Sequence, residues 1–227
     1  MKRLLCCLLA LALLMPAFTF AADTVAFTDS AGRTVQLPAH IERIAPSGPV
    51  AQMVLMSIAP ERFVGLATPF DRGEGQYMAH VVDLPVIGQL YGTRGDLNLE
   101  ELARLDPQVI IDVGEPKDNV AEDMDALQEQ LGIPCVHITM HLKDAGDAYR
   151  KLGELLGAQE KAEALATDCD EVFARAEEIM QQVGDKRVSL LYSLGDAGLN
   201  VIAQGSFHAE VIDLVAANAA VVGNPTS

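Results

Sequence analysis

Between Thr24 and Ile138 the hydrophobic and polar positions follow two alternating patterns. Short runs of about five apolar or β-branched residues, typical of strands, are separated by segments of about ten residues with apolar positions at helical spacing. The predicted strands lie at 43–45, 63–67, 85–88, 108–113 and 134–138, and the predicted helices at 50–57, 99–105 and 120–131. A hairpin of 24–28 and 33–37 around the turn 29–32 precedes them. This alternation predicts βαβ units and a mostly parallel sheet, an α/β fold.

The strand around Val109, Ile110 and Ile111 is apolar at successive positions. Such a run is expected of a strand that is covered on both faces. Ligands of parallel sheets bind beyond the carboxyl ends of the strands. The predicted binding edge is therefore formed by the loops that follow the strands, at 47–49, 68–71, 89–94 and 114–117.

From about Asp144 to Val183 the strands stop, and a helical pattern continues with a break only near Gly157. A helix of this length measures about 35–60 Å at 1.5 Å per residue, so we expect it to join two bodies. A second alternating unit begins with the apolar run 188–192, which predicts a strand that needs helices on both faces. The residues after Gly184 are too few to supply them, so we expect apolar side chains such as Val211 and Leu214 to be poorly covered. The predicted organisation is an N-terminal α/β lobe at 22–143, an interlobe helix at 144–184 and a partial C-terminal α/β lobe at 185–227.

The N-terminal residues 1–21 have the pattern of a cleavable signal peptide. Lys2 and Arg3 precede the apolar run 4–15, and small residues follow at Ala21 and Ala22. The apolar run is shorter than the roughly 20 residues that span a bilayer, and no second run of that length occurs. We therefore expect a secreted, periplasmic protein that does not span the membrane.

The composition is 50% hydrophobic and 21% charged, which is typical of a folded protein. The net charge is -16 at pH 7, and removal of Lys2 and Arg3 with the signal peptide makes it more negative. Nucleic acid and anionic membrane surfaces both require basic residues, so this charge argues against either as a partner. It suits a protein that docks on a basic surface.

Two cysteines, Cys135 and Cys169, remain after removal of the signal peptide. In an oxidising compartment they could form a disulfide. Neither belongs to a CxxC or Cys–His cluster, which argues against a zinc site built on them. Two separately buried thiols are the alternative.

Motifs of catalysis are absent from the sequence. It contains no GxSxG elbow, no Walker loop and no HExxH. The carboxylates Glu100 and Glu101 are neighbours on a predicted helix and point in different directions. We therefore do not expect an enzyme.

Several segments resemble the periplasmic binding proteins of ABC importers for iron siderophores, haem and cobalamin. The segments are DSAGRTVQLP at 29–38, IERI at 41–44, LNLEEL at 97–102, LDPQVII at 105–111 and GSFHAE at 205–210. Gln108 stands where the family usually has an aspartate. The resemblance implies two Rossmann-like α/β lobes joined by a long rigid helix, with the second lobe incomplete in this chain. It also implies a monomer that works with an ABC permease and its ATPase.

The resemblance implies that a metal chelate or a corrinoid binds in the cleft between the lobes. Broad, partly apolar ligands need aromatic walls and a few polar anchors. The candidate ligand-binding residues are Ser47, Phe70, Tyr91, Arg94, Lys117, Ser206 and His208, with Tyr77 close to the same rim. A packed loop aromatic is the alternative for Tyr91, and a solvated loop charge is the alternative for Arg94. No cofactor besides this ligand is expected.

Two further expectations follow from the resemblance. Members of the family present an acidic residue on each lobe to the permease, and the candidates here are Glu74 and Glu210. Related binding proteins hold a bare zinc or manganese ion with histidines and a carboxylate, and the candidate histidines are His80, His137, His141 and His208. The first strand ends in Ser47-Gly48-Pro49, where the metal-binding proteins usually have a histidine. Binding of a bare metal ion is therefore the alternative to binding of a chelate.

Overall fold

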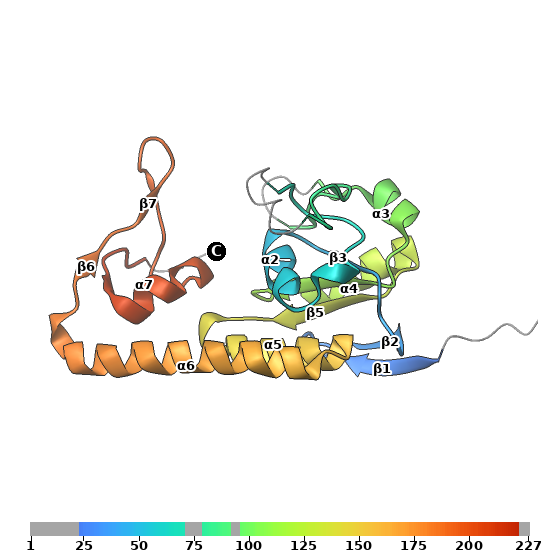
Figure 1. Ribbon diagram of the computed structural model, residues 1–227. Helices are drawn as coiled ribbons and strands as arrows, with labels where there is room; N and C mark the ends of the chain where they lie inside the picture. Colours follow the sequence, from blue (N-terminus) through green and yellow to red (C-terminus); the bar gives the residue numbers. More distant parts are fainter. Residues whose placement is uncertain (1–22, 71–78, 92–95, 223–227) are drawn as a thin grey trace, which may run out of the picture.

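The structure is a computed structural model, which describes residues 23–70, 79–91 and 96–222 (Figure 1). The predicted signal peptide at 1–21 lies outside these residues. At the start of the described chain, strands β1 (Thr24–Thr28) and β2 (Thr34–Pro38) form the predicted antiparallel hairpin. The Asp29 carboxylate fixes its turn by accepting hydrogen bonds from the amides of Ala31 and Arg33, at 3.0 and 2.9 Å.

Three parallel strands form the central sheet, in the order β3 (Ile44–Pro46), β4 (Val109–Gly114) and β5 (Cys135–Thr139). All six residues of β4 are buried, which confirms the predicted cover on both faces. The hairpin attaches to the outer edge of β5, since the Ser30 amide and the Arg33 guanidinium donate to backbone carbonyls of that strand, at 2.8 and 2.9 Å. Main-chain groups at the sheet edge are thereby satisfied.

The predicted strands at 63–67 and 85–88 are wrong as regular strands. The two segments contribute isolated bridges, which pair Ile44 with Phe63 and Leu66 with Val86. A side chain at Gly65 would press against Ile87 and Leu105, at 3.0 Å from each. The close approach of these segments therefore replaces a continuous ladder with single contacts.

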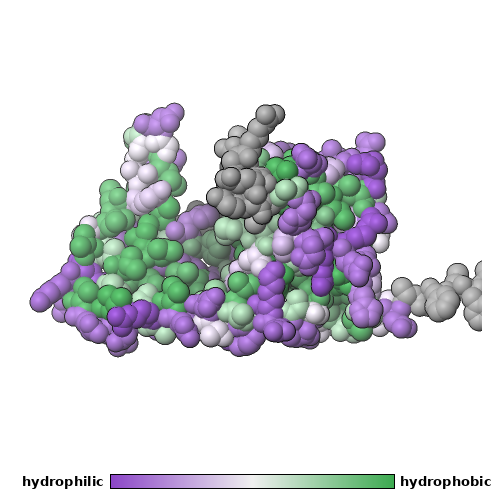
Figure 2. Space-filling view, viewed as in Figure 1, coloured by the Kyte–Doolittle hydropathy of each residue, from purple (hydrophilic) through white to green (hydrophobic). Residues whose placement is uncertain are grey.

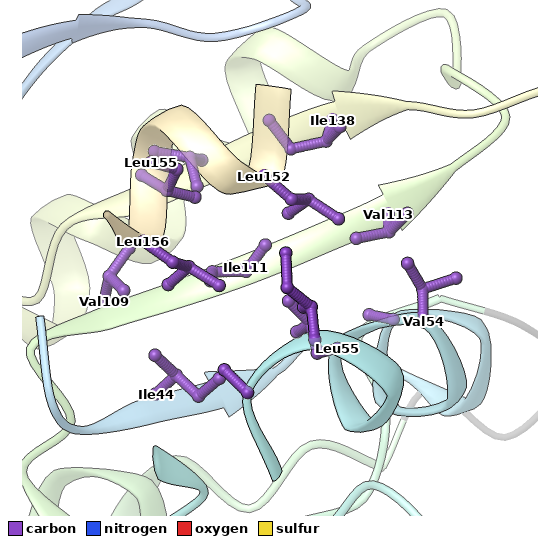
Figure 3. Packing of buried hydrophobic residues seen from close by; sticks show 14 of the residues in the cluster. Ile44, Val54, Leu55, Val109, Ile111, Val113, Ile138, Leu152, Leu155 and Leu156 are labelled. Carbon is purple, nitrogen blue, oxygen red and sulfur yellow. The ribbon is translucent and has the colours of Figure 1, made fainter. Parts of the chain in front are cut away.

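Helices cover both faces of the sheet. On one face lie α2 (Pro49–Ile58) and α5 (Ala145–Leu156), and on the other lie α3 (Leu99–Leu105) and α4 (Val120–Leu131). Figure 3 shows Leu55 and Leu152 packing against Ile111 on the first face. The neighbouring Ile110 belongs to the cluster on the opposite face, as the two-residue period of a strand requires. Each such side chain contributes about 1.5–3 kcal/mol on burial.

The helical segment predicted at 144–184 consists of two antiparallel helices. Helix α5 packs its leucines into the core of the first lobe, and α6 (Gln159–Val183) follows after Gly157, which has a φ of 63°. The span between the two lobes therefore belongs to α6, which is 25 residues long (Figure 1). We call residues 23–156 the first unit and residues 184–222 the second unit. No helix among the described residues has the length and apolarity needed to cross a membrane.

Small residues permit the close packing of α5 on α6. A Cβ at Gly153 would collide with the Cβ of Ala162, and a Cβ at Gly146 would collide with the carboxylate of Asp170. Arg150, between these glycines on α5, binds Glu163 and Asp170 of α6, with N–O distances of 2.8–3.1 Å. The contact combines close backbone approach with ion pairs along its edge.

The two cysteines are separate free thiols. Cys135 is buried in the cluster beneath α3 and α4, whereas Cys169 is partly exposed and packs against the other cluster. Burial raises the pKa of the Cys135 thiol to about 12. The two thiols are therefore separate, as in the alternative to a disulfide, but only Cys135 is buried as that alternative expected.

The second unit has short elements with little cover. They are β6 (Ser189–Leu190), β7 (Ser193–Leu194), β8 (Asn200–Val201), α7 (Glu210–Val215) and β9 (Ala217–Asn218). Strand β6 pairs in parallel with β9, and β7 pairs with β8 in an antiparallel manner. Of the strand predicted at 188–192 only Ser189–Leu190 is regular, and the poor cover expected of this lobe is confirmed, since Val188 is 72% exposed and Val211 is 58% exposed. Figure 2 shows much of this unit's surface as hydrophobic.

This exposure predicts how a protease attacks the chain. Chymotrypsin should cleave the second unit first, at exposed apolar residues such as Leu191, Tyr192 and Leu199. Phe27 and Phe63 of the first unit are buried and should resist cleavage. Mass spectrometry of a time course should therefore find products that end near β6 first. Cleavage on the N-terminal side of Leu156 should appear only later. Simultaneous cleavage of both units would contradict the expected difference in local stability.

Candidate functional site

A cavity of about 310 Å³ lies between the first and the second unit. Its polar walls come from Glu115, His141 and Lys143 of the first unit and from Ser206 and Glu210 of the second. Its apolar walls come from Phe173 of α6 and from Phe207 and Leu214 of the second unit. Figure 2 shows the surface hollowed between the two units above α6. Because both units and the helix between them line this cavity, it is the candidate site.

Glu210 holds the two units together at the cavity. Its carboxylate lies 2.6 Å from His141 Nδ1 and accepts a hydrogen bond from the Leu142 amide at 2.5 Å. The Phe207 ring also meets the His141 ring edge to face, with 5.8 Å between the centroids. Hydrogen bonds to an ionised carboxylate are about twice as strong as neutral ones. We call the contact of Glu210 with His141 and Leu142 the interlobe clamp.

Internal hydrogen bonds shape the wall that the second unit provides. Asp213 accepts from the Gly205 amide at 2.7 Å and from the Asn218 side chain at 3.0 Å. Ser206 is buried, and its hydroxyl donates to the carbonyl of Ala203 at 2.8 Å. The hydrogen bonds of Gly205 and Ser206 therefore fix the loop that precedes Phe207.

The first unit contributes charges of both signs. Glu115 follows β4, and its carboxylate pairs with Lys117 at 3.3 Å. Lys143 lines the cavity and makes no ion pair with any residue that the structure describes. Among the cavity's cations, Lys143 is thus the one best able to meet an anionic group of a ligand.

A polar network is buried in the sheet, between residues within β4 and β5 and the residue that follows β3. The Ser47 hydroxyl donates to Asp112, and the other oxygen of that carboxylate lies 2.7 Å from His137 Nδ1. His137 Nε2 lies 3.1 Å from the Thr139 hydroxyl. A serine nucleophile would need its hydroxyl on the imidazole, but Ser47 bonds to the carboxylate instead. The network satisfies buried polar groups and does not form a nucleophile–base pair.

The predicted ligand-binding residues lie in several places. Ser206 lines the cavity, Lys117 pairs with Glu115 at its edge, and His208 is exposed next to Phe207. Ser47 is buried in the network with Asp112. Phe70 is partly buried against the core of the first unit.

Tyr91 has the packing expected of a loop aromatic. Its ring lies against the cluster beneath α3 and α4, and its hydroxyl is buried with no partner among the described residues. Burial raises the pKa of Tyr91, and the carboxylates of Asp112 and Asp123 raise it further. Arg94 and Glu74, like Tyr77, lie outside the described residues.

The histidines named for a bare metal ion are dispersed. His80 and His208 are exposed, His137 pairs with Asp112 inside the sheet, and His141 pairs with Glu210. Within the described part of the chain, no group of three or more His, Cys, Asp and Glu side chains could hold a metal ion. Zinc sites need three or four such ligands.

Sequence reasoning missed Phe173 and Lys143 as cavity residues. Phe173 is the one aromatic residue of α6, and this was the available signal. Lys143 lies beyond the end of β5, in the loop for which the sequence suggested only His141, as a metal ligand.

The chain belongs to the periplasmic binding protein family, whose sequence pattern matches residues 71–226. An ABC transporter solute-binding protein from Sulfurospirillum deleyianum has a similar structure, with 23% identity and a TM-score of 0.78. The similarity covers 88% of this chain and 64% of that one, so this chain spans less than two-thirds of its length. The fold thereby confirms the α/β class expected from the sequence.

Two further solved structures are similar. The heme-binding protein HmuT is 18% identical, with a TM-score of 0.61 over 91% of this chain and 66% of that chain. The molybdate-binding protein MolA from Haemophilus influenzae is 16% identical, with a TM-score of 0.67 over 88% of this chain and 67% of that chain. No curated protein matches the sequence.

The interlobe clamp predicts the effect of Glu210→Ala. The substitution removes both hydrogen bonds across the cavity, and bonds to charged groups contribute about 1.5–3 kcal/mol each. The Leu142 amide should therefore exchange its hydrogen at least about tenfold faster, as measured by hydrogen–deuterium exchange. Glu177→Ala, on an exposed position of α6, is the control and should leave that amide unchanged. Unchanged exchange in Glu210→Ala would mean that the clamp does not hold the units together.

The buried network predicts a large loss of stability in Asp112→Ala. Removal of the carboxylate leaves His137 Nδ1 and the Ser47 hydroxyl, both buried, without this partner, and each such loss costs about 1–3 kcal/mol. Urea unfolding should show this loss, while Asp118→Ala, at an exposed position nearby, should change the unfolding free energy by less than about 0.5 kcal/mol. Equal stability of the two variants would show that water replaces the missing partner.

Proposed function

We propose that this protein is the extracytoplasmic solute-binding component of an ABC importer. It captures an iron chelate, such as a siderophore or haem, or a corrinoid in the interlobe cavity and delivers it to the permease with its ATPase. The observation that carries this proposal is a cavity lined by both units, in a chain of the periplasmic binding protein family. The predicted signal peptide at 1–21 supports a periplasmic location.

The composition of the cavity favours an organic chelate as the ligand. Phe173 and Phe207 offer two aromatic walls, and Lys143 and His141 offer groups that can meet carboxylates. HmuT, which is similar in structure, binds heme, and MolA binds molybdate. A bare ion would need converging ligands, and the described residues do not provide three of them. We therefore prefer the chelate to zinc or manganese.

Glu74 remains our proposed contact with the permease in the first lobe. For Glu210 the structure favours another role, since its carboxylate accepts two hydrogen bonds in the cavity wall. The Lys117 and Ser206 side chains stay candidates for ligand contact, because they lie at the cavity's edge and wall.

Native mass spectrometry can identify the ligand class. A chain beginning at Ala22 would be mixed separately with haemin, a ferric siderophore, cobalamin, molybdate and zinc. We expect a one-to-one complex with at least one of the three chelates. Retention of zinc alone would favour the bare-ion alternative, and failure to bind any of the five would contradict the proposed function.

The site predicts that Phe207→Ala weakens binding of that chelate. Loss of this partly buried aromatic wall should cost about 1–3 kcal/mol of binding free energy, or roughly fivefold to 150-fold in Kd. His208→Ala is the matched control, since His208 is the exposed neighbour of Phe207 and does not line the cavity. Titration monitored by absorbance would measure both. The reverse order of effects would place the ligand on the His208 side, outside the cavity.

A further inference from the structure

The second unit is tied to the first unit through one carboxylate. Among the residues that the structure describes, both hydrogen bonds between the two units end on Glu210, one from the Leu142 amide and one with His141 Nδ1. Glu210 is the first residue of α7, and His141 directly precedes the short helix η3 (Leu142–Asp144). The interlobe clamp therefore depends on the charges of two side chains, one from each unit.

Histidine is the member of this pair whose charge changes near neutral pH. An imidazole titrates between about pH 5 and 8, whereas a glutamate carboxylate is normally ionised throughout that range. The His141 and Glu210 side chains are 30% and 26% exposed, so protons from the solvent can reach the pair. At acidic pH an imidazolium donates to the carboxylate, and at alkaline pH a neutral imidazole takes its place. The hydrogen bond is stronger when both of its partners are charged.

The other charged groups around this imidazole do not replace the carboxylate of the clamp. Glu115, from the loop after β4, forms an ion pair with Lys117, and Asp213 of α7 accepts two hydrogen bonds within the second unit. Lys143 of η3 is a cation and opposes a positive charge on the ring. Of the described residues of α6, only Phe173 lines this cavity. The direct contact with Glu210 is therefore the interaction that changes most with the charge of the imidazole.

We propose that the interlobe clamp is a pH-dependent latch, which attaches the second unit to the first more firmly at mildly acidic pH than at neutral or alkaline pH. Phe207 packs against the His141 ring, with 5.8 Å between the centroids, and holds the ring in place at the contact. His141 and Glu210 both line the interlobe cavity, so the latch acts on the walls of the candidate site. The latch itself requires no ligand, and its effect on capture and release of a solute rests on the proposed function.

Hydrogen–deuterium exchange of the Leu142 amide measures the latch without a ligand. Exchange would be followed by NMR at pH 5.5 and 7.5 in a chain that begins at Ala22, and the ratio of the intrinsic to the observed rate at each pH gives the protection. We expect the protection of Leu142 to be about threefold to tenfold higher at pH 5.5, because the charge-assisted bond opens less often. The Ala162 amide, which donates to Ala158 at the start of α6, is the control and should have equal protection at both pH values.

Three variants test whether His141 and Glu210 are the pair responsible. His141→Gln keeps a neutral donor that does not titrate, and Glu210→Gln keeps an acceptor without the charge. In both, the protection of Leu142 should differ by less than about twofold between the two pH values. His208→Gln is the matched control, since His208 is exposed on the other side of Phe207, and it should keep the full pH dependence. Equal circular dichroism spectra would show that all variants are folded.

The outcomes separate this inference from the proposed function. Protection of Leu142 that is equal at pH 5.5 and 7.5 in the unsubstituted chain would overturn the inference. A pH dependence that persists in His141→Gln, or that His208→Gln removes, would overturn it as well, since another group would then be titrating. Because these measurements contain no ligand, the latch can fail while solute binding stands. Failure of the chain to bind any chelate would remove the proposed function and leave the measured pH dependence of Leu142 in place.

Discussion

The antiparallel contact of α5 with α6 determines where everything beyond residue 158 lies. Helix α5 is anchored in the first unit by Leu152, Leu155 and Leu156, so the contact transfers the rigidity of that core to α6. Glycines at two positions of α5 permit the close approach, and Arg150 ties the edge of the contact to Glu163 and Asp170. Side chains at the glycines would push α6 away from α5. Any such tilt would be magnified at the far end of a 25-residue helix, where the second unit begins.

The interlobe cavity follows from a two-point attachment of the second unit. The helix holds the unit at one end, and the interlobe clamp of Glu210 with His141 and Leu142 holds it near the sheet. A cavity bounded by two fixed points keeps its shape without a ligand, and such preorganisation lowers the entropic cost of binding. Because the Glu210 carboxylate is engaged in this clamp, its position near the start of a helix does not require a contact with a permease. In the sequence, Glu210 stands in a segment that resembles a whole family, and only the fold places it opposite His141.

The sequence predicted the parts of the fold that depend on local pattern. The sequence predicts the helices at 99–105 and 120–131 and the strand at 109–114, which is covered on both faces. In each of them the spacing of apolar residues matches the residues that are buried. Regular strands do not form over the full predicted segments 63–67, 85–88 and 188–192. An apolar run indicates that a segment tends to be buried, but it does not determine whether another strand pairs with it. The sequence shows that Tyr91 lies in a loop but not which way its ring points, and in the structure the ring packs against the core. The cavity residues Phe173 and Lys143 become neighbours only through the α5–α6 turn, which no local pattern encodes.

The polar groups inside the sheet have hydrogen-bond partners within the protein, whereas some of those in the cavity do not. Ser47 follows β3, whereas Asp112 and His137 lie within β4 and β5, and the three side chains satisfy one another and are buried. Their hydrogen bonds support the sheet, which in turn fixes β5 and the loop that begins at His141. In the cavity, by contrast, Lys143 has no ion pair with any described residue, and the Phe207 and Phe173 rings face open volume. An exposed cation without an ion pair and uncovered aromatic rings are groups that a noncovalent ligand can contact. These groups are available to a noncovalent ligand, as the proposed solute-binding function requires.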